Sequence, residues 1–231
     1  MNKTILFQDL GLIDYKDAWE IQKNLFKSNL IVKSNNRKNN EYKPTKNHLL
    51  FCEHPHVYTL GKGGDLKNLL LDEKKLGDFG VNFYHIDRGG DITYHGPGQI
   101  VGYPILDLEN FFTDIGRYLR YIEKSIILTL NDFGILGGVS DGETGVWINP
   151  GTPNSRKICA IGVKTSRWVT MHGFALNVNT DLSYFNNIIP CGIANKSVSS
   201  MEKELGVLVN ISDVKKRLTH HLSSVFSNYI D

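Results

Sequence analysis

The chain has 231 residues, a length that suits one domain of ordinary size, and 22% of them are charged while 41% are hydrophobic. Its formal net charge of +2 is too small to predict a nucleic-acid partner. No apolar run is long enough to span a membrane, and the first residues lack the pattern of a secretory signal peptide. The three cysteines, Cys52, Cys159 and Cys191, form no C-x-x-C pair, which is typical of reduced thiols. We therefore expect a single cytoplasmic domain over residues 1–231.

The first half of the chain alternates predicted strands with helices. Alternating or continuous apolar runs predict strands over residues 4–11, 48–54, 56–61, 82–87 and 99–108. Residues 14–30 carry apolar side chains four positions apart, which predicts a helix. The asparagine-rich, basic residues 33–47 show no period and are expected to form a mobile surface loop. The longest helix is predicted over residues 111–132, where apolar side chains form one stripe.

The second half is again rich in predicted strands. They cover residues 145–149, 157–165 and 168–179. Ser199 and Glu202 have the spacing of a capping box before a short helix, and a final helix is predicted over residues 212–229, with Val214 and Tyr229 among its inward side chains. No repeat or linker divides the chain. The pattern favours an α/β fold of the α+β type, with a mixed, largely antiparallel sheet flanked by helices.

Several common nucleotide and metal motifs are missing from the sequence. It contains no G-x-x-x-x-G-K-[ST] and no H-E-x-x-H, and the glycine-containing segments 61–66 and 96–101 both lack the final glycine of the dinucleotide-binding pattern. His54 and His56 are spaced like metal ligands, but no carboxylate or cysteine cluster completes a site. A structural or surface role is expected for that pair, and no metal site is predicted.

The segment RGGDITYHGPGQ, residues 88–99, is unusually rich in glycine and follows a predicted strand. Gly89 and Gly90 permit positive φ angles or close approach of the backbone to a ligand. The Arg88 guanidinium at the strand end is suited to binding a carbonyl or phosphate oxygen. Taken alone, the segment is equally compatible with a glycine-rich hairpin in which His95 makes ordinary structural hydrogen bonds.

Two further residues stand out by their placement. Lys157 begins an otherwise apolar predicted strand, where it either extends to water or, if partly desolvated, acts as a base or as the partner of a thiolate. Cys52 and Cys159 fall within apolar strands and are expected to be inert packing residues. Cys191 instead lies between a proline and a glycine, on a turn that presents its thiol to a cleft. Lys157 is the best candidate for the cation that a reactive thiolate needs.

Together these segments resemble the lipoyl(octanoyl) transferases, a family related to the biotin and lipoate protein ligases. The family pattern R-G-G-x-x-T-x-H-x-x-G-Q occurs at residues 88–99, and KICAIG, GFALNV and PCGI correspond to three further family motifs. The likeness extends from about residue 53 to residue 204. It implies the fold of the biotin/lipoate protein ligase catalytic domain.

The resemblance also implies an activity. The family transfers an octanoyl or lipoyl group from acyl carrier protein to a specific lysine of lipoyl domains, those of 2-oxoacid dehydrogenases and the glycine cleavage H protein. Cys191 is implied to carry the acyl group as a thioester, while Lys157 stabilises the thiolate and moves protons. No cofactor is implied, since an amide is more stable than a thioester and no nucleotide is needed.

By the same resemblance, three segments form the wall of an acyl-chain tunnel, with glycines admitting the chain beside the backbone. The implied substrate-binding residues are Arg88, Gly89, Gly90, Asp91, Ile92, Thr93, Tyr94, His95, Ala160, Ile161, Gly162, Gly173, Phe174 and Ala175. His95 and His172 are expected to order the site by hydrogen bonding. Two alternatives remain open: an ATP-dependent lipoate or biotin protein ligase on the same fold, and a non-catalytic protein that binds acyl chains or carrier protein.

Overall fold

The computed structural model describes residues 2–78, 80–189 and 197–227, so Cys191 lies outside the described residues. Two sheets are present in this part of the chain. The strands of the larger sheet are β1 (Ile5–Leu12), β2 (Asn47–Glu53), β6 (Gln99–Ile105), β7 (Gly137–Ser140), β8 (Glu143–Ile148), β9 (Arg156–Ser166), β10 (Val169–Asn177) and β11 (Ser197–Val198). The strands of the smaller sheet are β3 (Val57–Leu60), β4 (Asn82–His85) and β5 (Ile92–His95).

The larger sheet has the order β1-β2-β6-β10-β9-β8-β7, with β11 paired to β9, and the smaller sheet has the order β4-β3-β5. Pairing is parallel between β1 and β2, between β9 and β11 and between β3 and β4, and antiparallel between the other paired strands. The prediction of a mixed, largely antiparallel sheet is therefore confirmed.

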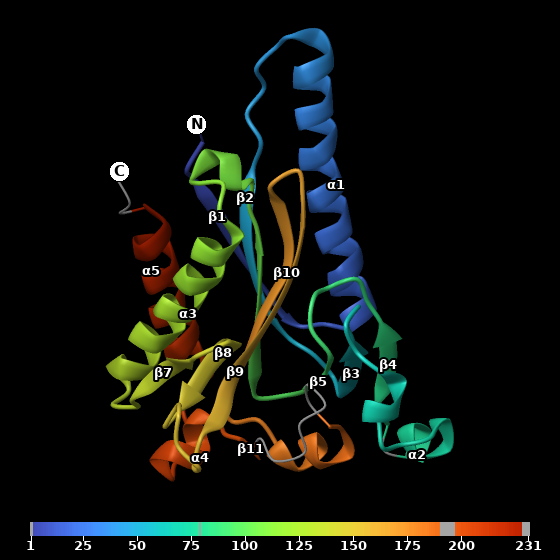
Figure 1. Ribbon diagram of the computed structural model, residues 1–231, viewed down its shortest axis with the longest axis vertical. Coiled ribbons are helices and arrows are strands. Elements are labelled where there is room, and N and C mark those ends of the chain that lie inside the picture. Colours follow the sequence, from blue (N-terminus) through green and yellow to red (C-terminus); the bar gives the residue numbers. More distant parts are fainter. Residues whose placement is uncertain (1, 79, 190–196, 228–231) are drawn as a thin grey trace.

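Helices cover both faces of the larger sheet (Figure 1). The helices are α1 (Tyr15–Asn39), α2 (Glu73–Asp78), α3 (Ile115–Asp132), α4 (Met201–Leu205) and α5 (Ile211–Ser227), with short 3₁₀ turns at Leu66–Asn68, Leu108–Asn110 and Leu182–Asn187. The packed pair α3 and α5 lies on one face and shares a large apolar core with it, while α1 covers the other face over a second core. The smaller sheet stands beside the beginning of α1 (Figure 1).

The predicted apolar stripe of α3 faces the core. Tyr118, Ile122, Ile126 and Leu130 are fully buried, as the spacing of three to four residues requires. The helix begins at residue 115 rather than at 111, because the Asp114 carboxylate accepts a hydrogen bond from the Arg117 N–H and caps the first turn. The final helix begins at residue 211, one residue earlier than predicted, and buries Val214. Tyr229 lies outside the described residues.

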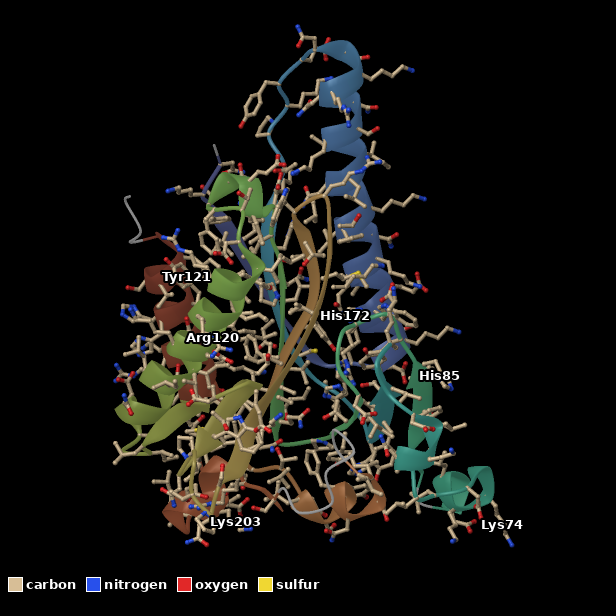
Figure 2. All side chains as sticks on the ribbon, viewed as in Figure 1. Lys74, His85, Arg120, Tyr121, His172 and Lys203 are labelled. Carbon is tan, nitrogen blue, oxygen red and sulfur yellow. The ribbon has the colours of Figure 1, made fainter. Side chains whose placement is uncertain are left out.

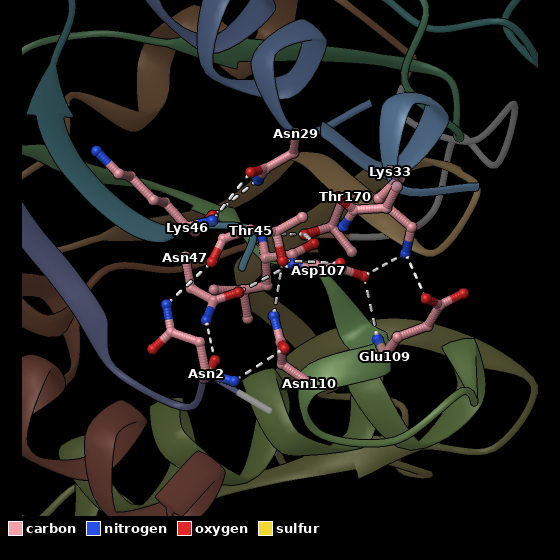
Figure 3. A network of polar contacts seen from close by, with 12 residues as sticks. Asn2, Asn29, Lys33, Thr45, Lys46, Asn47, Asp107, Glu109, Asn110 and Thr170 are labelled. Atoms are coloured by element: carbon pink, nitrogen blue, oxygen red, sulfur yellow. Dashed lines mark hydrogen bonds and ion pairs between the residues drawn. The ribbon is translucent and has the colours of Figure 1, made fainter. Parts of the chain in front are cut away.

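The prediction of a mobile loop over residues 33–47 is wrong. The first helix continues to Asn39, which makes α1 and not α3 the longest described helix, and only residues 40–46 connect it to β2. Polar side chains fasten the helix to residues 40–46 and to Asp107 (Figure 3). The Asn29 carboxamide bonds both the N–H and the carbonyl of Lys46, and Lys33 Nζ lies 2.6 Å from Asp107 Oδ1. These polar residues therefore hold two segments together instead of marking disorder.

A register shift in the sheet determines the direction of Lys157. Val146 pairs with Cys159 but Trp147 pairs with Lys157, so β9 contains one extra residue at this point, a β-bulge. Consistent with the bulge, the consecutive residues Ile158 and Cys159 are both buried in the same core. Because side chains otherwise alternate along a strand, the bulge turns Lys157 to the face shared by Ala160, away from that core.

The short helix near residue 200 forms as predicted, with a different cap. The Ser200 hydroxyl, not that of Ser199, accepts the hydrogen bond from the Lys203 N–H. Ser199 instead hydrogen-bonds Glu204. Among the described residues, no helix is both long enough and apolar enough to cross a membrane.

Candidate active site

A cavity lies between the larger sheet, the first turn of α1 and residues 88–95. Every described residue of the predicted site lines this cavity except Gly89 and Tyr94. The lining residues that were predicted are Arg88, Gly90, Asp91, Ile92, Thr93, His95, Lys157, Ala160, Ile161, Gly162, Gly173, Phe174 and Ala175. Three segments that are far apart in the sequence thus meet around one space.

Gly89 and Tyr94 have structural contacts instead. The Gly89 N–H donates to the Val163 carbonyl at 2.9 Å and joins this segment to β9. The Tyr94 side chain is fully buried in the core of the smaller sheet, stacked on the Tyr184 ring at 4.9 Å between centroids. Because β5 alternates, Thr93 and His95 face the cavity while Tyr94 faces away from it.

Part of the wall lies outside the predicted substrate-binding residues, although His172 was expected to order the site and Gln99 ends the family motif. The additional lining residues are Tyr15, Gln99, Val101, Tyr103, His172, Asn177, Phe185 and Val198. Gln99, Val101 and Tyr103 occupy alternate positions of β6, so the period of two in QIVGYPI was a signal that places all three on one face. Tyr15 and Phe185 come from separate segments, α1 and the 3₁₀ turn at Leu182–Asn187, and no local pattern assigns them to this cavity.

The glycines of the site allow backbones to pack against one another. A Cβ added at Gly162 would lie 2.8 Å from the Gly89 carbonyl oxygen, and one added at Gly61 would lie 2.4 Å from that of Gly90. Only glycine fits where two main chains approach this closely. The structure therefore gives Gly61 and Gly162 a packing role: they seat residues 88–90 on β9 and on the end of β3.

The Arg88 guanidinium is used within the protein. It is largely buried, and its Nη2 donates to the Thr59 carbonyl at 2.8 Å and to the Thr59 hydroxyl at 3.0 Å, while Nη1 donates to the Gly89 carbonyl at 3.0 Å. Such charge-assisted bonds hold the glycine segment in place against β3. Arg88 thus borders the cavity and also fixes its wall.

Two buried histidines make hydrogen bonds at the cavity. His95 Nδ1 lies 2.8 Å from Gln99 Oε1, and burial lowers its pKa to about 3, so its ring is neutral near pH 7. His172 Nε2 lies 2.8 Å from Asp87 Oδ1, and burial again outweighs the carboxylate and lowers the pKa of His172. The hydrogen bond to His172 and the ion pair with Lys164 hold the pKa of Asp87 well below its usual range. Both histidines make hydrogen bonds of the kind expected.

His172 also has an unusual backbone. Its φ is +62°, a left-handed conformation that is costly for a residue with a side chain, and its N–H donates to Gln22 Oε1 of α1 at 3.1 Å. In the described part of the chain its Nδ1 is buried without a hydrogen-bond partner. Figure 2 shows His172 on β10, in the middle of the molecule.

Lys157 approaches the cavity along a defined path. Its Nζ lies 4.6 Å from the centre of the Trp147 ring, and its Cδ and Cε lie 3.6 Å and 3.4 Å from the position that a Cβ on Gly145 would take. The lysine is half-buried, so its charge is partly desolvated. An ammonium group here is suited to stabilising an anion in the cavity.

The two described cysteines are core residues. Cys52 and Cys159 are fully buried, and burial raises the pKa of both thiols far above the usual range, so neither forms a thiolate near neutral pH. Cys191 lies outside the described residues. Among the side chains that the structure describes, no group of three or more His, Cys, Asp or Glu is arranged to hold a metal ion.

The histidine pair between β2 and β3 is structural. His54 is fully buried, with Nδ1 2.8 Å from the Ile13 carbonyl and Nε2 2.7 Å from the Tyr103 hydroxyl. His56 Nδ1 lies 2.7 Å from the Tyr94 hydroxyl. Both histidine rings are thus held by hydrogen bonds within the protein, which fits the expectation of a structural role.

Comparison with known proteins identifies the family. The model of the lipoyl protein ligase A/B catalytic domain matches residues 14–223. The chain belongs to this family. Proteins named octanoyltransferase from Flavobacterium johnsoniae and Flavobacterium psychrophilum are 63% and 62% identical over 227 residues, 98% of this chain and of each relative. The resemblance to the lipoyl(octanoyl) transferases is thereby confirmed.

Two solved structures have a similar fold. A bipartite lipoate protein ligase from Thermoplasma acidophilum matches with a TM-score of 0.69 at 17% identity, covering 97% of this chain and 85% of that one. A biotin protein ligase from Aquifex aeolicus matches with a TM-score of 0.50 at 11% identity, covering 98% and 70% of the two chains. The expected likeness to the biotin/lipoate protein ligase catalytic domain is confirmed.

Proposed function

We propose that this acyltransferase moves an octanoyl or lipoyl group from acyl carrier protein to a specific lysine of lipoyl domains, through a thioester on Cys191. The observation that carries the proposal is the entry of the Lys157 side chain into a cavity with a largely apolar and glycine-containing wall. Such a cavity suits a saturated acyl chain with its thioester near a cation. The near full-length identity to octanoyltransferases supports the same activity.

In the first step, the Cys191 thiolate attacks the carbonyl carbon of the octanoyl thioester. A carbon–sulfur bond to Cys191 forms, and the bond to the carrier thiol breaks. The Lys157 ammonium lowers the pKa of the Cys191 thiol by favouring its anion, and it supplies a proton to the departing carrier thiolate. The acyl chain lies against Ile92, Ala160 and Ala175, which are among the apolar residues of the cavity wall.

In the second step, the amine of the acceptor lysine attacks the same carbonyl carbon. The carbon–nitrogen bond forms, the bond to Cys191 breaks, and the proton lost by the amine passes to Lys157, which has become neutral in the first step. The cycle thereby restores the ammonium and the thiolate. Exchange of a thioester for an amide is favourable, so this course requires no nucleotide, metal or other cofactor.

The donor in this proposal is octanoyl-acyl carrier protein. The acceptors are the lipoyl domains of 2-oxoacid dehydrogenases and the glycine cleavage H protein, and the enzyme acts in the cytoplasm as one catalytic domain over residues 1–231. Acyl-chain contacts are assigned to the residues of segments 88–95, 160–162 and 173–175 that line the cavity, which leaves out Gly89 and Tyr94. His95 and His172 act as positioning residues for the wall through Gln99 and Asp87.

An assay with two donors tests the proposal. The enzyme and a lipoyl domain are incubated either with octanoyl-acyl carrier protein and no nucleotide, or with octanoate and ATP, and the mass of the lipoyl domain is measured. Octanoylation from the carrier protein alone is the expected result. Octanoylation only with octanoate and ATP would overturn the proposal in favour of a ligase, and octanoylation in neither mixture would favour a non-catalytic protein.

A further inference from the structure

A buried carboxylate lies behind the strand that supports Lys157. Glu123 projects from α3 toward the larger sheet, and only 1% of its side chain is exposed. Its Oε1 accepts a hydrogen bond from the Gly145 N–H of β8 at 2.9 Å. A buried acid is costly unless it is compensated, and the other buried residues of α3 are uncharged. Helix packing alone does not explain an acid at this position.

The contacts of Glu123 favour its ionised form. The Arg120 Nε lies 2.8 Å from Glu123 Oε2, and Figure 2 shows Arg120 on the same helix. Burial raises the pKa of Glu123, while the Gly145 N–H, Arg120 and the charge on Lys157 all act to lower it. An N–H donor and a cation both stabilise a carboxylate rather than a carboxylic acid.

Gly145 contacts both Glu123 and Lys157. Its N–H binds Glu123, and the Lys157 methylenes pack where its side chain would be. Its φ is +123°, in the region that favours glycine, and a Cβ there would lie 2.6 Å from the Cys159 carbonyl oxygen. The backbone at Gly145 is therefore shaped to turn an N–H toward Glu123 while leaving room for the lysine.

We propose that Glu123 is a positioning residue for Lys157, a buried anion that keeps the lysine protonated and holds it over Gly145. Attraction between opposite charges is mutual, so the carboxylate raises the proton affinity of the amine. This inference rests on the proposed function. It makes Glu123 the group that keeps the Lys157 ammonium, which serves the proposed thioester chemistry of Cys191, charged to higher pH than a half-buried lysine alone would be.

Other ionisable groups near Lys157 do not replace Glu123. On β8 the ionisable residue is Glu143, two positions before Gly145 and partly exposed. On β9, Arg156 is paired with Glu204 of α4, and burial keeps Cys159 neutral. The two residues of β11 are Ser197 and Val198, neither of which is ionisable near neutral pH. Glu123 is more deeply buried than Glu143, Glu204 and the cavity residue Asp91, so its charge is screened least by solvent.

Glu123→Gln is the decisive variant, because glutamine has the same shape and its carbonyl oxygen still accepts the Gly145 N–H. Glu123→Asp retains the charge, and Asp132→Asn removes an equal charge from the far end of the same helix. The measurement is the rate at which Lys157 of the full chain is acetylated by trace acetic anhydride across a pH series, followed by mass spectrometry. Only the neutral amine reacts, so the rate profile reports the pKa of Lys157.

We expect the profile of Glu123→Gln to move down by roughly one pH unit, so that Lys157 reacts about fivefold to tenfold faster at neutral pH. Glu123→Asp should show a smaller shift in the same direction, and Asp132→Asn none. An unshifted profile in a folded Glu123→Gln protein, or an equal shift in Asp132→Asn, would overturn the inference.

The acetylation profile of Lys157 can be measured whether or not Cys191 forms an acyl-enzyme. If Cys191 forms no thioester but Glu123→Gln still shifts the Lys157 profile, the proposed function fails while the electrostatic pairing stands. If the thioester forms in both proteins and the profile is unchanged, the pairing fails alone.

Discussion

Lys157 and Trp147 face each other across β8 and β9, and the lysine Nζ lies 4.6 Å from the centre of the indole ring. The pair exists because the bulge in β9 turns Lys157 out of the α3 side of the sheet, where Cys159 and the other core residues lie. An ammonium over an aromatic face is held by the ring quadrupole without being neutralised. Trp147 therefore orients the Lys157 side chain.

Replacing this ring should weaken catalysis in proportion to the loss of its aromatic face. Trp147→Leu is expected to slow single-turnover octanoyl transfer by about fivefold, which corresponds to a cation–π contribution of roughly 1 kcal/mol. Trp147→Phe leaves a similar void but retains a ring, and it should be impaired less. Equal transfer rates for the two variants, measured per folded enzyme, would show that the ring does not orient Lys157.

The two roles of Lys157 can be separated by substitution. Lys157→Arg keeps the positive charge but cannot release a proton near neutral pH. We expect it to retain slow alkylation of the active thiol while losing most octanoyl transfer. Lys157→Ala should lose both, with the thiol pKa returning toward about 8.5. The measurements are alkylation rate against pH and single-turnover transfer. Wild-type alkylation behaviour in Lys157→Ala would exclude the lysine as the activating group.

The close packing of residues 88–90 on β9 predicts the effect of adding one methyl group. Gly162→Ala places a Cβ 2.8 Å from the Gly89 carbonyl oxygen, so the segment must move and deform the cavity wall. A loss of about 1–3 kcal/mol in unfolding free energy is expected, together with slower transfer. Gly77→Ala on α2 is the control, because a Cβ there meets nothing within 4 Å. Similar thermal stability of the two variants would contradict the packing argument.

The buried histidines predict a loss of stability in mild acid. Burial lowers the pKa of His54 to about 4 and that of His95 to about 3, whereas an unfolded histidine titrates near 6.5. Below that value the unfolded chain binds more protons than the folded one, so stability falls as the pH falls. From pH 6.5 to pH 5 the two residues together should cost roughly 3 kcal/mol of unfolding free energy.

Urea denaturation at these two pH values measures the loss. His54→Gln and His95→Gln should each remove about half of the loss assigned to this pair, since each removes one of its two titrating groups. An unchanged difference in unfolding free energy between pH 6.5 and pH 5 in both variants would mean that other groups cause the acid sensitivity.

The sequence was most informative where a local rule acts alone. The stripe of α3 and the alternation of β6 predict buried faces, because helix and strand periods determine which side chains share a face. The motif segments predicted the cavity wall, and all but Gly89 and Tyr94 among the described residues line it. Tyr94 was predicted to line the cavity, but the alternation along β5 points its side chain into the core of the smaller sheet, which the motif does not reveal.

Other features depend on contacts between distant segments. Residues 33–39 have a composition typical of loops, yet they continue α1, where Lys33 pairs with Asp107 and Asn29 of the preceding turn binds Lys46. The role of Glu123 depends on a bulge and on Gly145, which lies 22 residues further along the chain. A short stretch of sequence shows neither relationship, because the partner residues come from distant segments that only the folded chain brings together.

The most direct test of the central claim is the intact mass of the enzyme after incubation with octanoyl-acyl carrier protein, without ATP and without a lipoyl domain. The account predicts a mass increase of one octanoyl group, mapped by peptide analysis to Cys191 and lost on addition of the lipoyl domain. Cys52→Ala and Cys159→Ala should keep the adduct, because both thiols are buried in the core. Cys191→Ser should abolish the thioester and nearly all transfer. A Cys191→Ser enzyme that transfers octanoyl at the wild-type rate would contradict the account.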